Sequence, residues 1–294
     1  MLLAARLSKV FDSERAAVDA AEETRAARRV SKPIPPNFAS LQAELERELD
    51  DTVTVDGLTG SWFIFQRARG HRHSIDDVLT AHYALEVSPS VTAHLDLGAG
   101  IGTVGLLVAW GMGSAAHLTA IEAQVTSHRL LVANVAANAL TARVRPLLGD
   151  LRELDLPERF PLITGSPPYF PASAGIVPQD SQKAHARFEL RGTVADYASA
   201  AARLLAPQGW FVFCFPTPQR RRALDAVANA GLYVARVRDV IPRAGLAPLF
   251  SLFACRHVNV AHSSMVDEPL VVRSADGALS STMASVRRSF GFES

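Results

Sequence analysis

The sequence predicts an α/β protein built on a doubly wound, mostly parallel sheet. From residue 91 onward, short apolar runs rich in β-branched residues alternate with amphipathic stretches of helical length. A strand, a helix and a second strand in sequence are joined by right-handed crossovers, so the strands run parallel and helices cover both faces. The 294-residue chain is 48 % hydrophobic and 20 % charged, which indicates a substantial buried core.

The predicted elements follow in chain order. Strands are expected at residues 91–97, 117–123, 143–149, 160–166 and 209–215. Helices are expected between them at 103–110, 127–139 and 196–206. Two further strand candidates, 232–240 and 248–258, close the domain. Because ligands of such sheets bind beyond the carboxyl ends of the strands, the first four strand ends are the candidate sites of chemistry.

The first 50 residues are predicted to be an N-terminal helical extension with a linker, ahead of a main domain over residues 51–294. Residues 12–30 are rich in Ala, Glu and Arg with opposite charges at helical spacing, which predicts an exposed helix. Three prolines within residues 31–38 predict a linker, and a second helical stretch follows at 38–51. An alanine-rich face buries little area, so the first helix is expected to be peripheral.

Composition excludes several classes of protein. Thirty Lys and Arg against 29 Asp and Glu leave a formal charge of +1, so any nucleic-acid surface must be local. Cys214 and Cys255 lie in apolar runs, which predicts buried, reduced thiols. No apolar stretch approaches the ~20 residues that span a bilayer. The N-terminal apolar segment is too short for a secretory signal, so we expect a cytoplasmic protein with no membrane partner.

The first strand end carries the sequence DLGAGIGTVG. Gly98, Gly100 and Gly102 let the backbone turn sharply and approach a ligand closely. Gly100, Gly102 and Gly105 also spell the dinucleotide fingerprint GxGxxG, with Glu122 about 20 residues further on, so NAD stays open at this point.

The acid before these glycines favours a different cofactor. Asp96 would meet a dinucleotide phosphate with its own negative charge, whereas a cationic nucleoside without phosphate would tolerate it. That description fits S-adenosylmethionine. Glu122, at the second strand end, can accept both ribose hydroxyls. At the third end, Asp150 can accept from an exocyclic amine and the Leu151 amide can donate to an adenine ring nitrogen.

The fourth strand end, SPPYF, indicates the class of reaction. Proline fixes the backbone and donates no hydrogen bond, so the Ser166 hydroxyl and the Pro167 carbonyl can present a fixed pair of acceptors. Such a pair fits a planar NH2 group. Pro168 completes the rigid turn, and Tyr169 is expected to offer a flat face on which an aromatic ring stacks.

The chemistry of amine methylation explains these residue types. The lone pair of an adenine amine is delocalised into its ring, so two acceptors must hold the N–H groups and draw the nitrogen toward tetrahedral geometry. Transfer from a methyl sulfonium then needs in-line approach and no acid, so positioning supplies most of the rate. A stacked base cannot reach such a pocket, which favours a looped or flipped-out base, and an RNA loop offers one cheaply.

With DLGAGIG, IEAQ, GD and SPPYF in order, the chain resembles class I S-adenosylmethionine-dependent methyltransferases that methylate amines. It is more narrowly similar to the bacterial tRNA(Val) adenine-37 N6-methyltransferases over roughly residues 60–285. The resemblance implies a Rossmann-like, seven-stranded sheet with an antiparallel last strand and S-adenosylmethionine as cofactor. It also implies RNA as substrate, and tRNA as the kind of RNA. No stable protein partner is expected.

The resemblance also implies roles for individual residues. The cofactor would be held by Asp96, Gly98, Ala99, Gly100, Gly102, Glu122, Asp150 and Leu151. The target base would be held by Ser166, Pro167, Pro168 and Tyr169. The family usually has Asn at the position of Ser166, and Ser at this place is also seen in cytosine N4-methylating enzymes.

Two basic clusters are candidates for phosphate contacts near the pocket mouth: Arg67, Arg69 and Arg72 with His71 and His73, and Arg220 to Arg222. Solvated surface arginines are the alternative. Two histidines without a Cys or carboxylate partner rarely bind a metal, so no metal is expected.

Rival functions stay open on the sequence alone. A protein glutamine N5-methyltransferase would also hold a planar amine in a Pro-Pro-Tyr turn. Cytosine N4-methylation is compatible with Ser166. A binding module with a degenerate site and, more remotely, an NAD oxidoreductase complete the alternatives.

Overall fold

The computed structural model describes residues 34–173, 178–260 and 263–292. The helix predicted at 12–30 lies outside these residues. In the described part, nine strands form one sheet in the order β10-β8-β9-β7-β6-β3-β4-β5, with β11 pairing beside β8. Their bounds are β3 (Ala93–Leu97), β4 (His117–Glu122), β5 (Val144–Leu148), β6 (Phe160–Gly165), β7 (Leu205–Pro216), β8 (Leu232–Arg243), β9 (Phe250–His257), β10 (Met265–Val266) and β11 (Leu270–Arg273).

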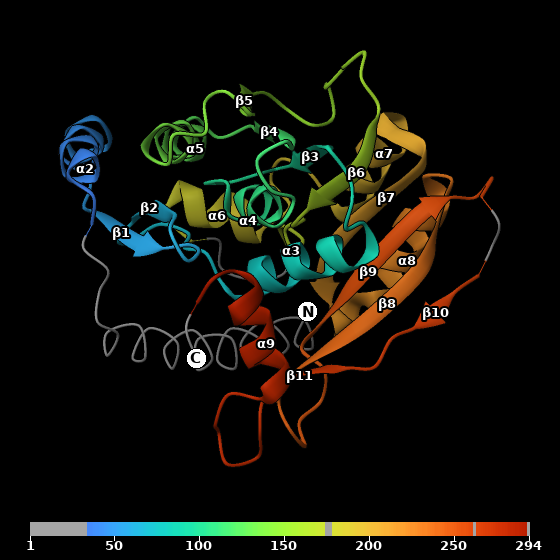
Figure 1. Ribbon diagram of the computed structural model, residues 1–294. Coiled ribbons are helices and arrows are strands. Elements are labelled where there is room, and N and C mark those ends of the chain that lie inside the picture. The colour runs from blue at the N-terminus through green and yellow to red at the C-terminus, as the bar shows by residue number, and fades with distance from the viewer. Residues whose placement is uncertain (1–33, 174–177, 261–262, 293–294) are drawn as a thin grey trace.

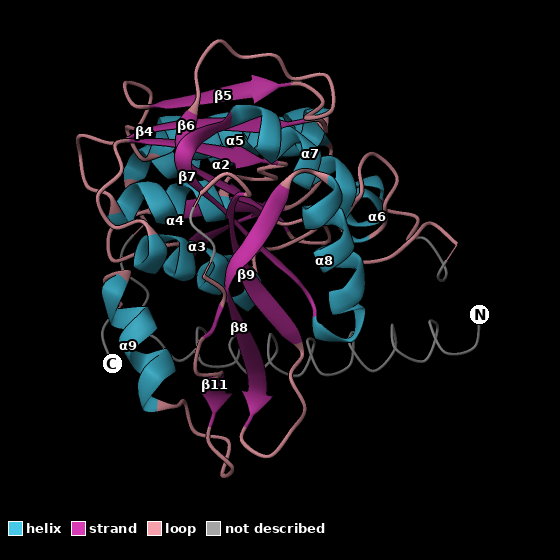
Figure 2. Cartoon of the chain, turned by 90° about the vertical axis from the view of Figure 1, so that its right-hand side faces the viewer, coloured by secondary structure: helices cyan, strands magenta, loops and turns pink. Residues whose placement is uncertain are grey.

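The predicted sheet is confirmed. Strands β3 to β7 pair in parallel, and β9 runs antiparallel to both β7 and β8. The short strands β10 and β11, which the sequence did not predict, lengthen the β8 edge in parallel. Figure 2 shows β8 and β9 as long neighbouring strands next to α8. The seven main strands therefore carry the fold, and the C-terminal segment only widens its edge.

Helices cover both faces of the sheet (Figure 1). On one face lie α3 (Ile75–Val87), α4 (Thr103–Gly111) and α5 (Val125–Ala137); on the other lie α7 (Val194–Leu204) and α8 (Arg220–Asn229). The reversal of strand order at β3 and β6 produces this division, because right-handed crossovers that move in opposite directions place their helices on opposite faces. The remaining short helices are α6 (Ser181–Arg187), η1 (Thr217–Gln219) and α9 (Ser281–Ser289).

Local chemistry fixes the helices that border the site. A reciprocal capping box between Ser74 and Asp77 begins α3, and a second one between Thr193 and Asp196 begins α7. Both cysteines are buried and unpaired, as predicted. Burial raises the pKa of the Cys214 thiol to about 12, so the thiol stays neutral.

The second half of the N-terminal extension packs onto the main domain. Helix α2 (Pro36–Leu49) begins inside the predicted linker, because proline is compatible with the first turn of a helix. Strands β1 (Val53–Gly57) and β2 (Phe63–Arg67) form an antiparallel hairpin. The buried ring of Phe38 lies 5.3 Å from the rings of Phe63 and Phe65, which both belong to β2. Whether residue 50 is a domain boundary stays a prediction.

Within the described residues no helix is long and apolar enough to cross a membrane.

Candidate active site

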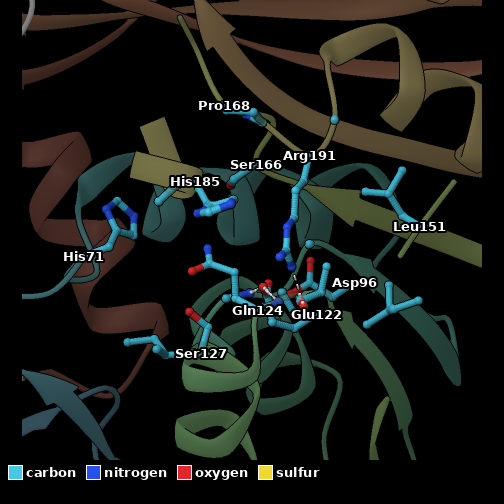
Figure 3. A pocket seen from close by; sticks show the side chains of 18 of the residues that line it. His71, Asp96, Glu122, Gln124, Ser127, Leu151, Ser166, Pro168, His185 and Arg191 are labelled. Atoms are coloured by element: carbon cyan, nitrogen blue, oxygen red, sulfur yellow. Dashed lines mark hydrogen bonds between the residues drawn. The ribbon is translucent and has the colours of Figure 1, made fainter. Parts of the chain in front are cut away.

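An open cavity lies at the carboxyl ends of β3, β4, β5 and β6, where the sequence predicted the site. Its volume is about 1010 Å3 with the open mouth included. The loop before α3, helix α6 and helix α7 supply further walls. Figure 3 shows Ser166 and Pro168 on one side of the cavity and Asp96 and Glu122 on the other. Nine of the predicted cofactor-binding and base-binding residues line it: Asp96, Gly98, Ala99, Gly100, Glu122, Asp150, Leu151, Ser166 and Pro168. His71 and His73 of the first basic cluster line it as well.

The glycine turn after β3 presents bare backbone to the cavity. Gly98 and Gly100 have φ angles of 60° and 58°, in the left-handed region that glycine adopts without strain. A Cβ atom built on Gly100 would meet nothing within 4 Å, so the space above this residue is open. The Gly100 amide donates to Glu122 Oε2 at 2.8 Å, which joins the first strand end to the second.

Gly102 lies outside the cavity lining, at the start of α4, with a φ of 96°. A Cβ atom there would lie 2.6 Å from Leu131 Cδ1, so the glycine allows close packing between α4 and α5. Its predicted contact with the cofactor stays a prediction.

Asp96 lines the cavity, but its carboxylate points into the protein. Oδ2 accepts from the Gly105 amide at 2.9 Å, and Oδ1 accepts from the Thr164 hydroxyl at 2.6 Å. That hydroxyl also lies 2.7 Å from His94 Nε2. Burial raises the pKa of Asp96 to about 6 against the opposing effect of these hydrogen bonds. Asp96 thus ties β3 to α4 and to β6.

Glu122 is buried at the second strand end. One oxygen accepts from Gly100 and the other accepts from the Gln124 amide at 2.7 Å. Burial raises the pKa of Glu122, and the backbone donors and nearby Arg191 oppose this effect. The Arg191 side chain extends into the cavity toward Glu122 (Figure 3) and donates to the Ala123 carbonyl at 3.1 Å. Each Glu122 oxygen keeps lone-pair capacity for a ligand hydroxyl.

Asp150 is positioned by its neighbour Arg152. The guanidinium contacts both carboxylate oxygens, the shortest distance being 2.6 Å, and this pair lowers the pKa of Asp150. The carboxylate is therefore charged and its orientation is fixed. Leu151 is 6 % exposed and gives the third strand end an apolar surface.

The Ser-Pro-Pro corner opens into the same cavity. Ser166 and Pro168 line it, and the Ser166 hydroxyl lies 3.7 Å from the Cys214 sulfur. Pro167 is buried and does not line the cavity. Of the two acceptors predicted at this corner, the structure therefore brings the Ser166 hydroxyl to the cavity.

The predicted stacking role of Tyr169 does not match its placement. The side chain is 6 % exposed, does not line the cavity, and packs edge-on against Phe215 with ring centroids 5.9 Å apart. Its hydroxyl donates to Asp76 Oδ2 at 2.8 Å. A buried phenol needs a hydrogen-bond partner, and α3 provides one in the protein interior. In this conformation Tyr169 anchors the corner from behind.

Most of the predicted phosphate-binding arginines have acidic partners within the protein. Arg67 forms ion pairs with Asp51 and Asp180, and Arg72 pairs with Asp56. The cluster at the start of α8 is similar, because its three arginines pair with acidic side chains: Arg220 with Asp239, Arg221 with Asp225 and Arg222 with Glu189. Their contact with phosphates stays a prediction.

Several cavity residues escaped the sequence analysis, among them Gln182, Arg191 and Tyr197. Gln182 of α6 is buried and donates to Ser127 while accepting from the His71 amide, so it holds α6 against the rest of the site. Arg191 lies in a loop. Tyr197 belongs to the apolar face of α7, where a helical pattern gives no signal of function. No cluster of three His, Cys, Asp or Glu side chains with metal-binding geometry occurs in the described ranges.

Comparisons with known proteins agree with this geometry. No protein-family model matches the chain. A tRNA1(Val) (adenine(37)-N6)-methyltransferase of Actinobacillus pleuropneumoniae serotype 7 is 24 % identical over 196 residues, covering 67 % of this chain and 80 % of the relative. A protein of the same description from Bacteroides thetaiotaomicron is 29 % identical over 154 residues, covering 52 % and 64 %. The chain resembles the bacterial tRNA1(Val) adenine(37)-N6-methyltransferases.

Solved structures establish the fold independently of this resemblance. The crystal structure of a predicted O-methyltransferase from Agrobacterium tumefaciens superposes with a TM-score of 0.57 at 18 % identity. It covers 73 % of this chain and 96 % of its own. The chain thus shares the Rossmann-like α/β fold of this solved methyltransferase.

Proposed function

We propose that this protein transfers a methyl group from S-adenosylmethionine to the exocyclic N6 of an adenine in tRNA. The observation that carries the proposal is that Ser166, at the end of β6, opens onto the same cavity as the glycine turn and Glu122. The methyl donor and the acceptor amine can therefore bind next to each other in one cavity. The names of the similar proteins support adenine and tRNA as the substrate.

The residues at the strand ends fit the cofactor. The open backbone at Gly100 leaves room for a ligand, and the Glu122 carboxylate suits a ribose diol. Asp150 and Leu151 offer an acceptor and an apolar surface to an adenine ring. The cofactor supplies an electrophilic methyl group, and the protein supplies orientation and exclusion of water.

The Ser-Pro-Pro corner would hold the target amine. The Ser166 hydroxyl can accept one N–H of the amine, which draws the nitrogen lone pair out of conjugation with the ring. Neighbouring Cys214 is neutral because burial raises its pKa to about 12, so it offers no competing thiolate nucleophile.

Basic side chains near the cavity mouth support an RNA substrate. Helix α6 and the segment after it carry Lys183, His185, Arg187 and Arg191, of which His185 and Arg191 line the cavity. Cationic groups here would contact the phosphates on either side of a base that has left its stack.

Mass spectrometry of nucleosides tests the proposal. Purified protein is incubated with isotopically labelled S-adenosylmethionine and unmodified tRNA, total RNA or ribosomal release factors, with Ser166→Ala as a matched control. Labelled N6-methyladenosine in tRNA, much reduced with Ser166→Ala, is the expected result. Labelled N4-methylcytidine would reassign the base, and label found only in protein would overturn the proposal.

A further inference from the structure

The side chain of Tyr197 lies against both Gly98 and Gly165 at the cavity. Its hydroxyl lies where a side chain on Gly98 would begin, and a Cβ atom built on Gly165 would be only 2.8 Å from its ring. Gly98 starts the glycine turn, and Gly165 directly precedes Ser166. Both glycines therefore make room for this one ring, which lies between the cofactor turn and the acceptor corner.

The hydroxyl of Tyr197 has no hydrogen-bond partner in the part of the chain that the structure describes, although the side chain is only 6 % exposed. The residue lines the cavity, so the oxygen faces the space that a ligand would fill. Burial, together with the negative charges of Glu122, Asp96 and Asp150, raises the pKa of Tyr197, which keeps the phenol neutral. Buried tyrosine hydroxyls normally have a partner, so a ligand atom is expected to provide one.

We propose that Tyr197 is a cofactor-positioning residue whose hydroxyl oxygen contacts the positively charged sulfonium end of S-adenosylmethionine. This inference rests on the proposed function. The part of the cavity between Gly98 and Ser166 is the place where donor and acceptor must meet, and a neutral oxygen there favours the polarised C–H groups beside a sulfonium. The Asp96 carboxylate cannot take this role in the same way, because it points into the protein and accepts from the Gly105 amide and the Thr164 hydroxyl. Glu122 is assigned to the ribose diol in the proposed function.

Calorimetric binding of two related ligands tests this assignment. S-adenosylmethionine and S-adenosylhomocysteine share the ribose, the adenine and the carboxylate, and differ in the methyl group and the positive charge. Tyr197→Phe keeps the ring between the two glycines, so the variant should fold. We expect it to weaken S-adenosylmethionine binding about twofold to fivefold more than S-adenosylhomocysteine binding.

Tyr83→Phe is the matched control, because Tyr83 is also a buried tyrosine but its hydroxyl donates to Asp267 and it does not line the cavity. The ratio of the two affinities should stay unchanged in this variant. An unchanged ratio in Tyr197→Phe, including equal weakening of both ligands, would overturn the sulfonium assignment alone. A wild-type protein that binds neither ligand would overturn the proposed function and this inference together.

Discussion

The hydroxyl of Tyr169 donates a hydrogen bond of 2.8 Å to the buried carboxylate of Asp76. Asp76 lies in the first turn of α3, and Tyr169 follows the Ser-Pro-Pro corner after β6. The bond therefore fixes the corner to a residue of α3 that lies 93 positions earlier in the chain. It explains why an aromatic residue at this position serves the site without lining it.

Removing this bond should destabilise the protein. We expect Tyr169→Phe to lower the free energy of unfolding by about 1–3 kcal/mol, because the buried Asp76 carboxylate loses a donor. Urea denaturation measures the loss. In a double-mutant cycle with Asp76→Asn, the two substitutions should be non-additive by about 0.5–3 kcal/mol. Strict additivity would show that the two side chains are energetically independent.

Ser166 should affect turnover more than cofactor binding. Ser166→Ala removes the acceptor at the corner, so methyl transfer is expected to slow by about 10- to 100-fold, which corresponds to about 1.4–2.7 kcal/mol for one N–H group left without its acceptor. The affinity for S-adenosylmethionine, measured by calorimetry, should change little. Ser166→Asn should retain adenine methylation, and its complete loss would point to a different acceptor base.

The two left-handed glycines should respond differently to alanine. Gly100→Ala meets only the strain of its positive φ, about 1–2 kcal/mol. Gly98→Ala also collides with the Tyr197 hydroxyl, so we expect a larger loss, about 2–5 kcal/mol in total. Thermal or urea unfolding measures both. Adding Tyr197→Phe should recover part of the loss in Gly98→Ala and none in Gly100→Ala.

Asp96 should make stability depend on pH. Its pKa is raised from 3.8 to about 6 by burial, so between these values the folded protein holds a proton that the unfolded chain has released. The free energy of unfolding should therefore fall as pH rises through this window, by about 3 kcal/mol at ~1.4 kcal/mol per pKa unit.

Asp96→Asn provides the reference for this measurement. The pKa of buried His94 is lowered to about 3, so His94 makes the free energy of unfolding rise with pH in both proteins, and its contribution cancels in their difference. The stability of the wild type relative to Asp96→Asn should decline from pH 4 to pH 6 and then level off. A flat difference would show that the Asp96 carboxylate is ionised throughout.

The buried packing of α2 should contribute more to the free energy of unfolding than the ion pairs on its surface. Phe38→Ala removes a ring that is 2 % exposed and is expected to cost about 3–5 kcal/mol. Arg129→Ala breaks partly exposed ion pairs with Glu44 and Glu48 and should cost less than about 1 kcal/mol. Equal, small losses in urea unfolding would indicate that α2 folds separately from the main domain.

The sequence by itself determined the sheet and the place of the site. Alternating apolar strands and amphipathic helices are local patterns, and the parallel order with right-handed crossovers follows from them. The glycine turn, Glu122 and Ser166 stand at the carboxyl ends of strands, which is where an open α/β sheet binds its ligands.

Only the tertiary structure decided which side chains face the cavity. Tyr169 follows the fourth strand end, and Tyr197 lies in helix α7. No local sequence pattern shows which of the two side chains faces the cavity. Tyr169 turns inward because Asp76 of α3 satisfies its hydroxyl, while Tyr197 reaches the cavity because Gly98 and Gly165 leave room for its ring. Residues distant in sequence therefore decide the orientation of each side chain, because a buried hydroxyl needs a hydrogen-bond partner from the protein or from a ligand.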